Sequence, residues 1–444
     1  MCNALVNDIV KTTQVVFGLI LYSSEALSVA VLAPFFPVEA RKLGLSSLFI
    51  GAIMAAFDYA LLTFTILLMG IVSSENLKLF YFFGPIISGV GNISFGIAYY
   101  GPPFWMFGIL SLICRLFSGC GGAMHSSTAY SMLSYAIPNN KAKITSLLES
   151  SYGLGLILGP IIGSFLFIMG GYAFVFVFLG AFQILICFCN IPLIKNTMIS
   201  SELEVKSSAT FYAKYIFRPY IFAITIIMVM IASADGIMDT VLSPYLTDKF
   251  NVDYSVIGYI FLFASLCYTC ACFIAGFFLS RGNAVVLFMS SIILVTIGFV
   301  VLFIPYCIPS LENPYQISFS LGILSIGQAC CFVPSYALIE DISSEYDLNT
   351  LSQRQFLSTF TNIFSYSLGG VLGPLVFGGY VYDTLGFYIA SLHQAGLMTI
   401  CFVLGIGVFC SLRHRKKAYL CSDVNNVENS LLIKKPGFSL KRTM

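Results

Sequence analysis

The chain has 444 residues, of which 58% are hydrophobic and only 9% are charged, and its formal net charge is +2. Water-soluble proteins carry about 25% charged residues. The composition, with a mean hydropathy of +0.91, therefore excludes a set of soluble domains and predicts an integral membrane protein. The small net charge and the lack of a basic stripe interleaved with aromatic residues argue against nucleic-acid binding.

At about 20 apolar residues per crossing, the chain divides into twelve predicted membrane spans. They cover residues 13–36, 48–72, 77–99, 104–133, 142–168, 172–194, 219–243, 255–279, 284–304, 315–339, 352–381 and 386–411. These apolar runs are too long for the strands of a membrane β-barrel, and hydrophobic and polar residues do not alternate along them. The pattern favours an all-α membrane protein. The first run has no small-residue cleavage signature and is read as a span, not a signal peptide.

The placement of Lys and Arg predicts that both termini are cytosolic, because basic residues collect in the short loops on that side. The predicted organisation is a cytoplasmic N-terminus at 1–12, a six-helix bundle at 13–194, a cytoplasmic central loop at 195–218, a second six-helix bundle at 219–411 and a cytoplasmic tail at 412–444.

The two sets of six spans carry the same pattern. Glu25 precedes a proline by nine residues in EALSVAVLAPF, and Asp235 does so in DGIMDTVLSPY. The next span of each half opens with Ile-Gly, at Gly51 and Gly258. We therefore expect two pseudo-symmetric six-helix bundles, and parallel repeats around a midplane site are typical of transporters.

Two glycine motifs refine this expectation. The stretch RLFSGCGGA from Arg115 resembles the helix-4 signature of the major facilitator superfamily, and GLGLILGPIIGS in the fifth span resembles the antiporter signature of its drug:proton exchange branch. The conformational motif consists of Gly155, Gly159, Pro160 and Gly163, with Gly373 and Pro374 in span 11. Small residues at this spacing let helices approach and proline bends a helix, so packing or hinging is favoured over ligand contact.

Longer stretches resemble the vesicular amine transporter family, especially its polyamine-transporting branch. They are APFFPVEARKLG, PNNKAKITSLLESSYGLGLILGP and IMDTVLSPYLTDKF. The resemblance implies proton-coupled loading of organic cations into acidic vesicles. Monoamine members have acids at the positions of Glu25 and Asp341, and the polyamine branch shares Arg115, Glu149 and Asp239.

This chain departs from the monoamine members at two positions. Their helix-2 lysine is replaced by Asp58, and their helix-11 acid falls near Asn362 or Ile363.

The acids also point to a cation site on physical grounds. Glu25, Asp58, Asp235 and Asp239 lie within apolar spans, where each charge costs about 2.5–3.5 kcal/mol, against a single deep cation, Arg115. Asp235 and Asp239 are spaced i,i+4 and share a helix face about 6 Å apart. Protons and organic cations would compete for such carboxylates, which is the basis of antiport. A purely structural role for the acids is the alternative.

The predicted substrate- or proton-binding residues are Glu25, Asp58, Asp235, Asp239 and Asp341, with Arg115 and Glu149 as counter-charges or coupling residues. His125 is expected to be packed and hydrogen-bonded rather than functional, and Tyr59, Tyr152 and Tyr245 are candidates for cation–π contacts. No metal site, cofactor or enzymatic activity is predicted, and transport is expected to use a proton gradient because the chain has no nucleotide-binding GxxxxGK[ST] loop.

The tail contains ENSLLI, with Glu428, Leu432 and Ile433, which fits an acidic dileucine sorting signal read by an adaptor. The predicted function is a proton-coupled antiporter that moves polyamines or related cations into an acidic vesicle or endolysosome. Three alternatives stay open: a vesicular monoamine transporter, a plasma-membrane multidrug exporter, and a non-transporting membrane sensor or scaffold.

Overall fold

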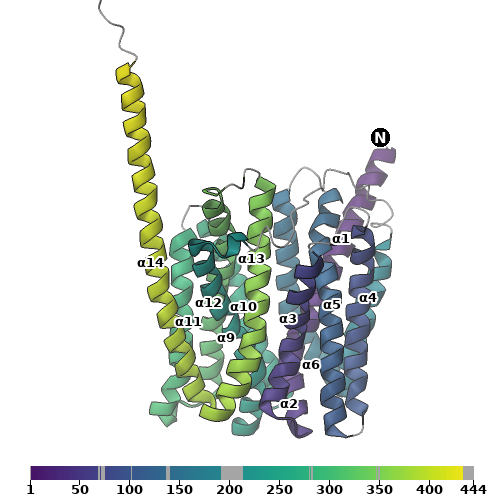
Figure 1. The fold of residues 1–444 in the computed structure, drawn as a ribbon. Coiled ribbons are helices and arrows are strands. Elements are labelled where there is room, and N and C mark those ends of the chain that lie inside the picture. The colour runs from purple at the N-terminus through teal and green to yellow at the C-terminus, as the bar shows by residue number, and fades with distance from the viewer. Residues whose placement is uncertain are drawn as a thin grey trace, which may run out of the picture.

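The computed structural model describes residues 2–68, 71, 76–101, 103–136, 141–191, 214–279, 281, 284–346, 348 and 351–433. Nearly all of them are helical, and the long helices stand side by side (Figure 1). The helices are α1 (Cys2–Ala30), α2 (Leu32–Lys42), α3 (Ser47–Leu68), α4 (Leu77–Ile97), η1 (Ala98–Tyr100), α5 (Phe104–Ala136), α6 (Lys141–Cys189), α9 (Pro219–Phe250), α10 (Tyr254–Leu279), α11 (Ala284–Cys307), η3 (Pro309–Leu311), α12 (Pro314–Ser343), α13 (Leu351–Leu372), η4 (Gly373–Val381) and α14 (Tyr382–Ile433). The predicted all-α membrane class is confirmed.

Ten helical stretches of the described chain are long and apolar enough to cross a membrane. Two are much longer than a bilayer needs, Ser150–Cys189 and Leu357–Cys410. Each contains a glycine with positive φ, Gly171 at +72° and Gly386 at +76°, a conformation that only glycine adopts without steric cost. Dividing both stretches at these glycines would turn the ten stretches into twelve, and the number of twelve spans stays a prediction.

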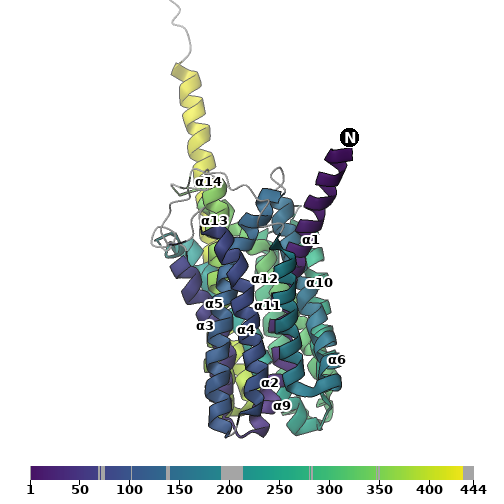
Figure 2. The same ribbon diagram turned by 90° about the vertical axis from the view of Figure 1, so that its right-hand side faces the viewer.

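The start of α1 and the end of α14 lie at the same end of the bundle. The N-terminus of α1 and the extension of α14 project there, while α2 lies at the opposite end (Figures 1 and 2). We call these the termini end and the far end.

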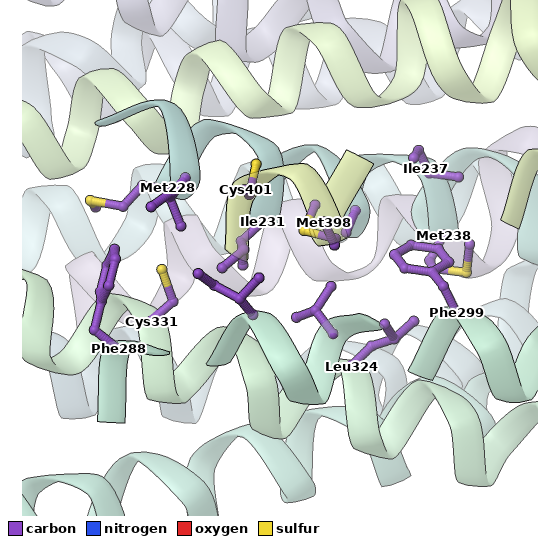
Figure 3. Close-up of a cluster of buried hydrophobic side chains, with 14 of the residues drawn as sticks. Met228, Ile231, Ile237, Met238, Phe288, Phe299, Leu324, Cys331, Met398 and Cys401 are labelled. Atoms are coloured by element: carbon purple, nitrogen blue, oxygen red, sulfur yellow. The ribbon is translucent and has the colours of Figure 1, made fainter. Parts of the chain in front are cut away.

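The two repeats pack as two helical bundles. In the first half α1 packs on α6, and α5 packs on α3 and α4. In the second half α9 packs on α13, and α12 packs on α10 and α11. A buried cluster joins α9, α11, α12 and α14 of the second half (Figure 3); it includes Met228, Ile231, Ile237, Met238, Phe288, Phe299, Leu324, Cys331, Met398 and Cys401.

The repeated glycines pack helices in equivalent ways. A Cβ on Gly159 would lie 2.6 Å from the Cβ of Ala30, so α6 approaches α1 closely at this point. In the second half a Cβ on Gly373 would lie 3.1 Å from the Cα of Gly236 in α9. These distances are shorter than carbon atoms tolerate. The glycines therefore let backbones approach, as the packing interpretation of the motif requires.

A second pair of glycines packs one half against the other. Gly51, at the start of α3, lies against the carbonyl group of Pro374 in η4. Gly258, at the start of α10, lies against Ser164 and the carbonyl oxygen of Pro160 in α6. Each half thus contributes one glycine and one proline segment, and the interface between the halves follows the sequence repeat.

The far end is held together by polar contacts between the halves. Ser243 donates a hydrogen bond of 2.7 Å from its hydroxyl to the carbonyl of Ala33, and Arg41 forms an ion pair of 2.8 Å with Asp248. Glu39, which is 7% exposed, accepts a hydrogen bond from the hydroxyl of Tyr254 across the interface. Lys42 contacts both Glu39 and Tyr254, at 3.0 and 2.6 Å.

A separate polar cluster ties the far ends of α9 and α14 to the loop before α12. The carboxylate of Glu312 accepts hydrogen bonds from Tyr245 at 2.9 Å and Tyr388 at 2.5 Å, and it lies 3.3 Å from the ammonium of Lys249. Burial opposes ionisation, but the hydrogen bonds from Tyr388, Tyr245 and Lys249 outweigh it and lower the pKa of Glu312. Glu312 therefore stabilises the fold in its charged form.

Candidate functional site

Three carboxylates meet where the two halves face each other. Asp58 projects from α3 of the first half and interacts electrostatically with Asp235 of α9 in the second half. Asp239, one turn further along α9, interacts with both of them. The Asp58 carboxylate lies against Gly370 of α13, a glycine whose Cβ would lie 2.5 Å from the Asp58 Oδ2 atom. The structure thus brings together three of the five acids in the predicted binding set, and we call them the acidic group.

Two further residues of the second half touch the acidic group. Gln328 of α12 forms a side-chain hydrogen bond with Asp235. Tyr366 of α13 interacts electrostatically with all three aspartates of the group and with Tyr152. Gln328 and Tyr366 were not singled out from the sequence, because an amide or a phenol in an apolar span is common and neither occurs in a recognisable motif.

Arg115 supplies the positive charge beside this group. Its guanidinium stacks over the ring of Phe57 at 4.7 Å and interacts electrostatically with Asp58. Arg115 is 4% exposed, and its Nε atom has no hydrogen-bond partner among the described residues. Among the described residues, no ion pair joins Arg115 to Asp58. Arg115 therefore offsets the negative charge of the acidic group without forming a direct contact with one of its carboxylates. Its role as counter-charge stays a prediction, and its place beside Asp58 is compatible with it.

The acidic group has the chemistry of a site for organic cations. The three aspartates are at least half-buried in the middle of long helices. Carboxylates in apolar helices are costly and are found where a cation or proton binds. Among the described residues, no three His, Cys, Asp or Glu side chains are arranged to hold a metal ion.

Glu25 has a hydrogen-bond partner outside the acidic group. Its Oε2 atom is 2.7 Å from the Nδ1 atom of His125 on α5, and both side chains are buried. His125 is thus hydrogen-bonded, as expected. The contact joins α1 to α5, whereas the equivalent acid Asp235 bonds Gln328 and joins α9 to α12. The repeat therefore preserves which helices meet at this position but not the chemistry of the partner.

Two other predicted residues lie elsewhere. Asp341 is exposed in the last turn of α12, thirteen residues or about 20 Å along the helix from Gln328, so the structure does not bring it to the acidic group. Glu149 lies within α6, and its side chain is outside the described residues. Asn362, where monoamine members have an acid, is buried and accepts a hydrogen bond of 2.7 Å from the hydroxyl of Ser335.

The three candidate aromatic residues separate in the structure. Tyr59 is 56% exposed, and Tyr245 is bonded to the Glu312 cluster at the far end. Tyr152 lies near the acidic group through Tyr366. The backbone of α14 includes the predicted sorting residues Glu428, Leu432 and Ile433, but their side chains are outside the described residues.

The family follows from comparison with known proteins. A family model described as Major Facilitator Superfamily matches residues 18–374 and 222–431, which together span most of the chain. The chain belongs to the major facilitator superfamily. It is 27% identical to MFS-type transporter SLC18B1 of Homo sapiens over 394 residues, covering 87% of this chain and 84% of that protein. The Rattus norvegicus protein of the same name is also 27% identical, over 86% of this chain and 83% of its own length. These matches confirm the resemblance seen in the motifs.

Solved structures show the same fold at low identity. The inward-facing and occupied crystal structure of a bacterial homolog to the human lysosomal transporter Spinster has a TM-score of 0.68 and 13% identity, covering 89% of this chain and 96% of that one. The crystal structure of the nucleoside transporter NupG has a TM-score of 0.69 and 14% identity, over 90% and 99% of the two chains. These structures show the fold; the family match and the similarity to SLC18B1 identify the chain as a multi-pass membrane transporter of this superfamily.

Proposed function

We propose that this chain is a proton-coupled antiporter that moves organic cations, with polyamines preferred, from the cytosol into an acidic vesicle or endolysosome. The observation that carries the proposal is the acidic group, Asp58, Asp235 and Asp239, placed between the two halves. The termini end would face the cytosol and the far end the vesicle lumen, as the distribution of basic residues favours.

A polyamine suits the acidic group because its charges are spread along a flexible chain. Asp235 and Asp239 lie one helical turn apart on α9, while Asp58 reaches them from the other half. Ammonium groups separated by a few methylenes could each meet a carboxylate. The partly exposed phenol of Tyr366 lies among the same acids and could provide a cation–π face.

Coupling follows from competition for the carboxylates. A proton that neutralises an aspartate removes the attraction for an ammonium group, so acidification on the lumenal side favours release of the cation. Arg115 places a positive charge beside Asp58 in the same region of the protein. The similarity to SLC18B1, an MFS-type transporter, and the antiporter signature in α6 support this reading.

The test is uptake of labelled spermidine, with serotonin in parallel, into proteoliposomes with an acidic interior. Wild-type uptake should collapse with a protonophore, and Asp58→Asn and Asp239→Asn should each reduce it roughly tenfold or more, since a charge contact between ligand and protein is lost. Asp253→Asn, an exposed acid before α10, is the matched control and should transport normally.

The other outcomes distinguish the alternatives. Serotonin uptake without spermidine uptake would indicate a monoamine transporter. Uptake of many unrelated cations, with the protein at the plasma membrane of its cell, would indicate a multidrug exporter. No flux of either cation through a folded and inserted protein would overturn the cation assignment and favour a sensor or scaffold.

A further inference from the structure

The buried contact between Glu25 and His125 has atoms that no other contact uses. The His125 ring is fully buried, and the Glu25 side chain is 8% exposed. Their mutual contact occupies Nδ1 of the ring and Oε2 of the carboxylate, at 2.7 Å. The other atoms, Nε2 of His125 and Oε1 of Glu25, have no hydrogen-bond partner among the described residues. Leaving a buried polar atom unpaired costs about 1–3 kcal/mol, so such atoms call for a functional explanation.

With Glu25 ionised, one arrangement of the proton within this pair satisfies the contact. An ionised carboxylate only accepts hydrogen bonds, so Nδ1 carries the hydrogen that faces Oε2. In the neutral imidazole Nε2 is then an unprotonated acceptor with no donor. One added proton at Nε2 converts a neutral ring and a carboxylate, with net charge −1, into an imidazolium–carboxylate pair with net charge zero. Since charge is expensive in this apolar setting, the pair has a reason to bind one proton.

Aromatic side chains pack around the pair. Tyr22 of α1 and Tyr81 of α4 place their rings 5.9 and 5.4 Å from the His125 ring, and Tyr152 of α6 lies 5.9 Å from Tyr22. From α3 the apolar Phe57 lies on the other side of Gly122, which contacts Glu25. The nearest cation on α5 is Arg115, ten residues or about 15 Å earlier along the axis. Tyrosine is neutral near pH 7, so these rings add no charge beside the pair, and the Arg115 guanidinium stacks over the Phe57 ring at 4.7 Å.

The second half lacks this chemistry at the equivalent place. Asp235, which matches Glu25 in the repeat, bonds the amide of Gln328, a group that does not titrate. Histidine ordinarily changes charge between pH 5 and 8, which spans the difference between cytosol and an acidic vesicle. The repeat has therefore placed a titrating partner in one half and a non-titrating partner in the other.

We propose that the Glu25–His125 pair is a second proton-binding site of the transport cycle, outside the acidic group that binds the cation, and that coupling requires its proton. This inference rests on the proposed function and divides its work between two sites. The pair gains one proton at His125 Nε2 from the acidic lumen and loses it to the cytosol, while Asp58, Asp235 and Asp239 bind and release the cation.

The first test separates coupling from cation binding. In proteoliposomes with the membrane potential clamped at zero and a pH difference of 1.5 units, coupling to one proton per cation allows a spermidine accumulation of about 30-fold. Wild type should approach this ratio. His125→Gln should fall to about 1 yet still exchange internal for external spermidine at equal pH. His393→Gln, an exposed histidine on α14, is the matched control and should behave as wild type.

Two outcomes of this test overturn the inference. His125→Gln that accumulates spermidine with the wild-type pH dependence shows that the proton binds elsewhere. A folded His125→Gln that loses both accumulation and exchange shows that His125 belongs to the cation site. Size-exclusion profile and thermal midpoint in detergent decide whether the variant is folded.

A second measurement needs no substrate and isolates the proton site from the proposed function. Nitrogen-15 histidine spectra of the purified protein at pH 7.5 and pH 5.5 should show His125 gaining a proton at Nε2, with the signal assigned by its loss in His125→Gln. Glu25→Gln should change this titration, whereas Asp239→Asn should not. If the His125 signal is the same at pH 7.5 and pH 5.5, the inference is overturned even if spermidine is transported. If the His125 signal changes but the protein transports no cation, only the proposed cation function is overturned.

Discussion

A methyl group added at Gly51 should open the far end of the protein. A Cβ there would lie 2.9 Å from the carbonyl carbon of Pro374 and closer still to its oxygen. These are backbone atoms of the other half, so no side-chain rotation relieves the overlap. Carbon atoms pack best at about 3.5–4.0 Å, so the halves must move apart by about 1 Å at this point.

The magnitude follows from the cost of overpacking. Inserting a methylene-sized group into a packed interface costs about 1–3 kcal/mol. At about 1.4 kcal/mol per factor of ten, Gly51→Ala should lower the ratio of closed to open far end by about 5- to 150-fold.

Hydrogen–deuterium exchange in nanodiscs measures this opening without a label. Exchange should rise in α2 and in the last two turns of α9, which form the far-end contacts. Gly276→Ala is the matched control, because a Cβ at Gly276 of α10 has no neighbour within 4 Å. It should leave exchange at the far end unchanged. Exchange in Gly51→Ala equal to that of wild type would refute the packing argument.

Four further substitutions test the same end of the molecule. Gly258 occupies the position in the second half that Gly51 occupies in the first. Gly258→Ala should therefore also raise hydrogen–deuterium exchange at the far end if the two glycine contacts act together. Exchange equal to that of wild type would show that they do not. Glu39→Gln should raise exchange in α2 by several-fold, because the substitution removes a buried charged hydrogen-bond acceptor. Arg41→Ala should change exchange in α2 little, because the exposed ion pair between Arg41 and Asp248 is worth only about 0.2–1 kcal/mol. Glu312→Gln should lower the thermal midpoint at pH 7 but not at an acidic pH below the folded-state pKa of Glu312: the pKa of this acid is lowered in the folded state, so its contribution is lost as the pH falls through that lowered value. A midpoint difference that persists at the acidic pH would contradict this.

The sequence predicted the fold from features that repeat along the chain. The glycines Gly51 and Gly258 and the proline segments of the fifth and eleventh spans were recognised as repeated positions. The structure adds that each glycine contacts the proline segment of the opposite half. Spacing alone could not show this, because a repeat identifies equivalent positions within each half but does not say which surfaces meet between halves.

The side-chain directions were harder to predict because lipid and protein core are equally apolar. In a soluble helix the polar face marks solvent, but in these spans every face is hydrophobic. Asp58 and Tyr59 are adjacent on α3, yet Asp58 faces the second half and Tyr59 is 56% exposed. Charge was the better guide: three of the four acids read as deep within spans form the acidic group, and the fourth, Glu25, has its own buried partner.

Pseudo-symmetry and its violations have different roles in this protein. The glycine contacts at Gly51 and Gly258 obey the repeat, so both sides of the interface can open and close by the same kind of motion. The polar partners break it, with His125 beside Glu25 and Gln328 beside Asp235. On the proposed function, the glycine contacts that both halves share allow the same kind of movement on each side of the interface. The partners that differ between the halves let the first half respond to protons, while the second half contributes two of the three carboxylates to the cation site.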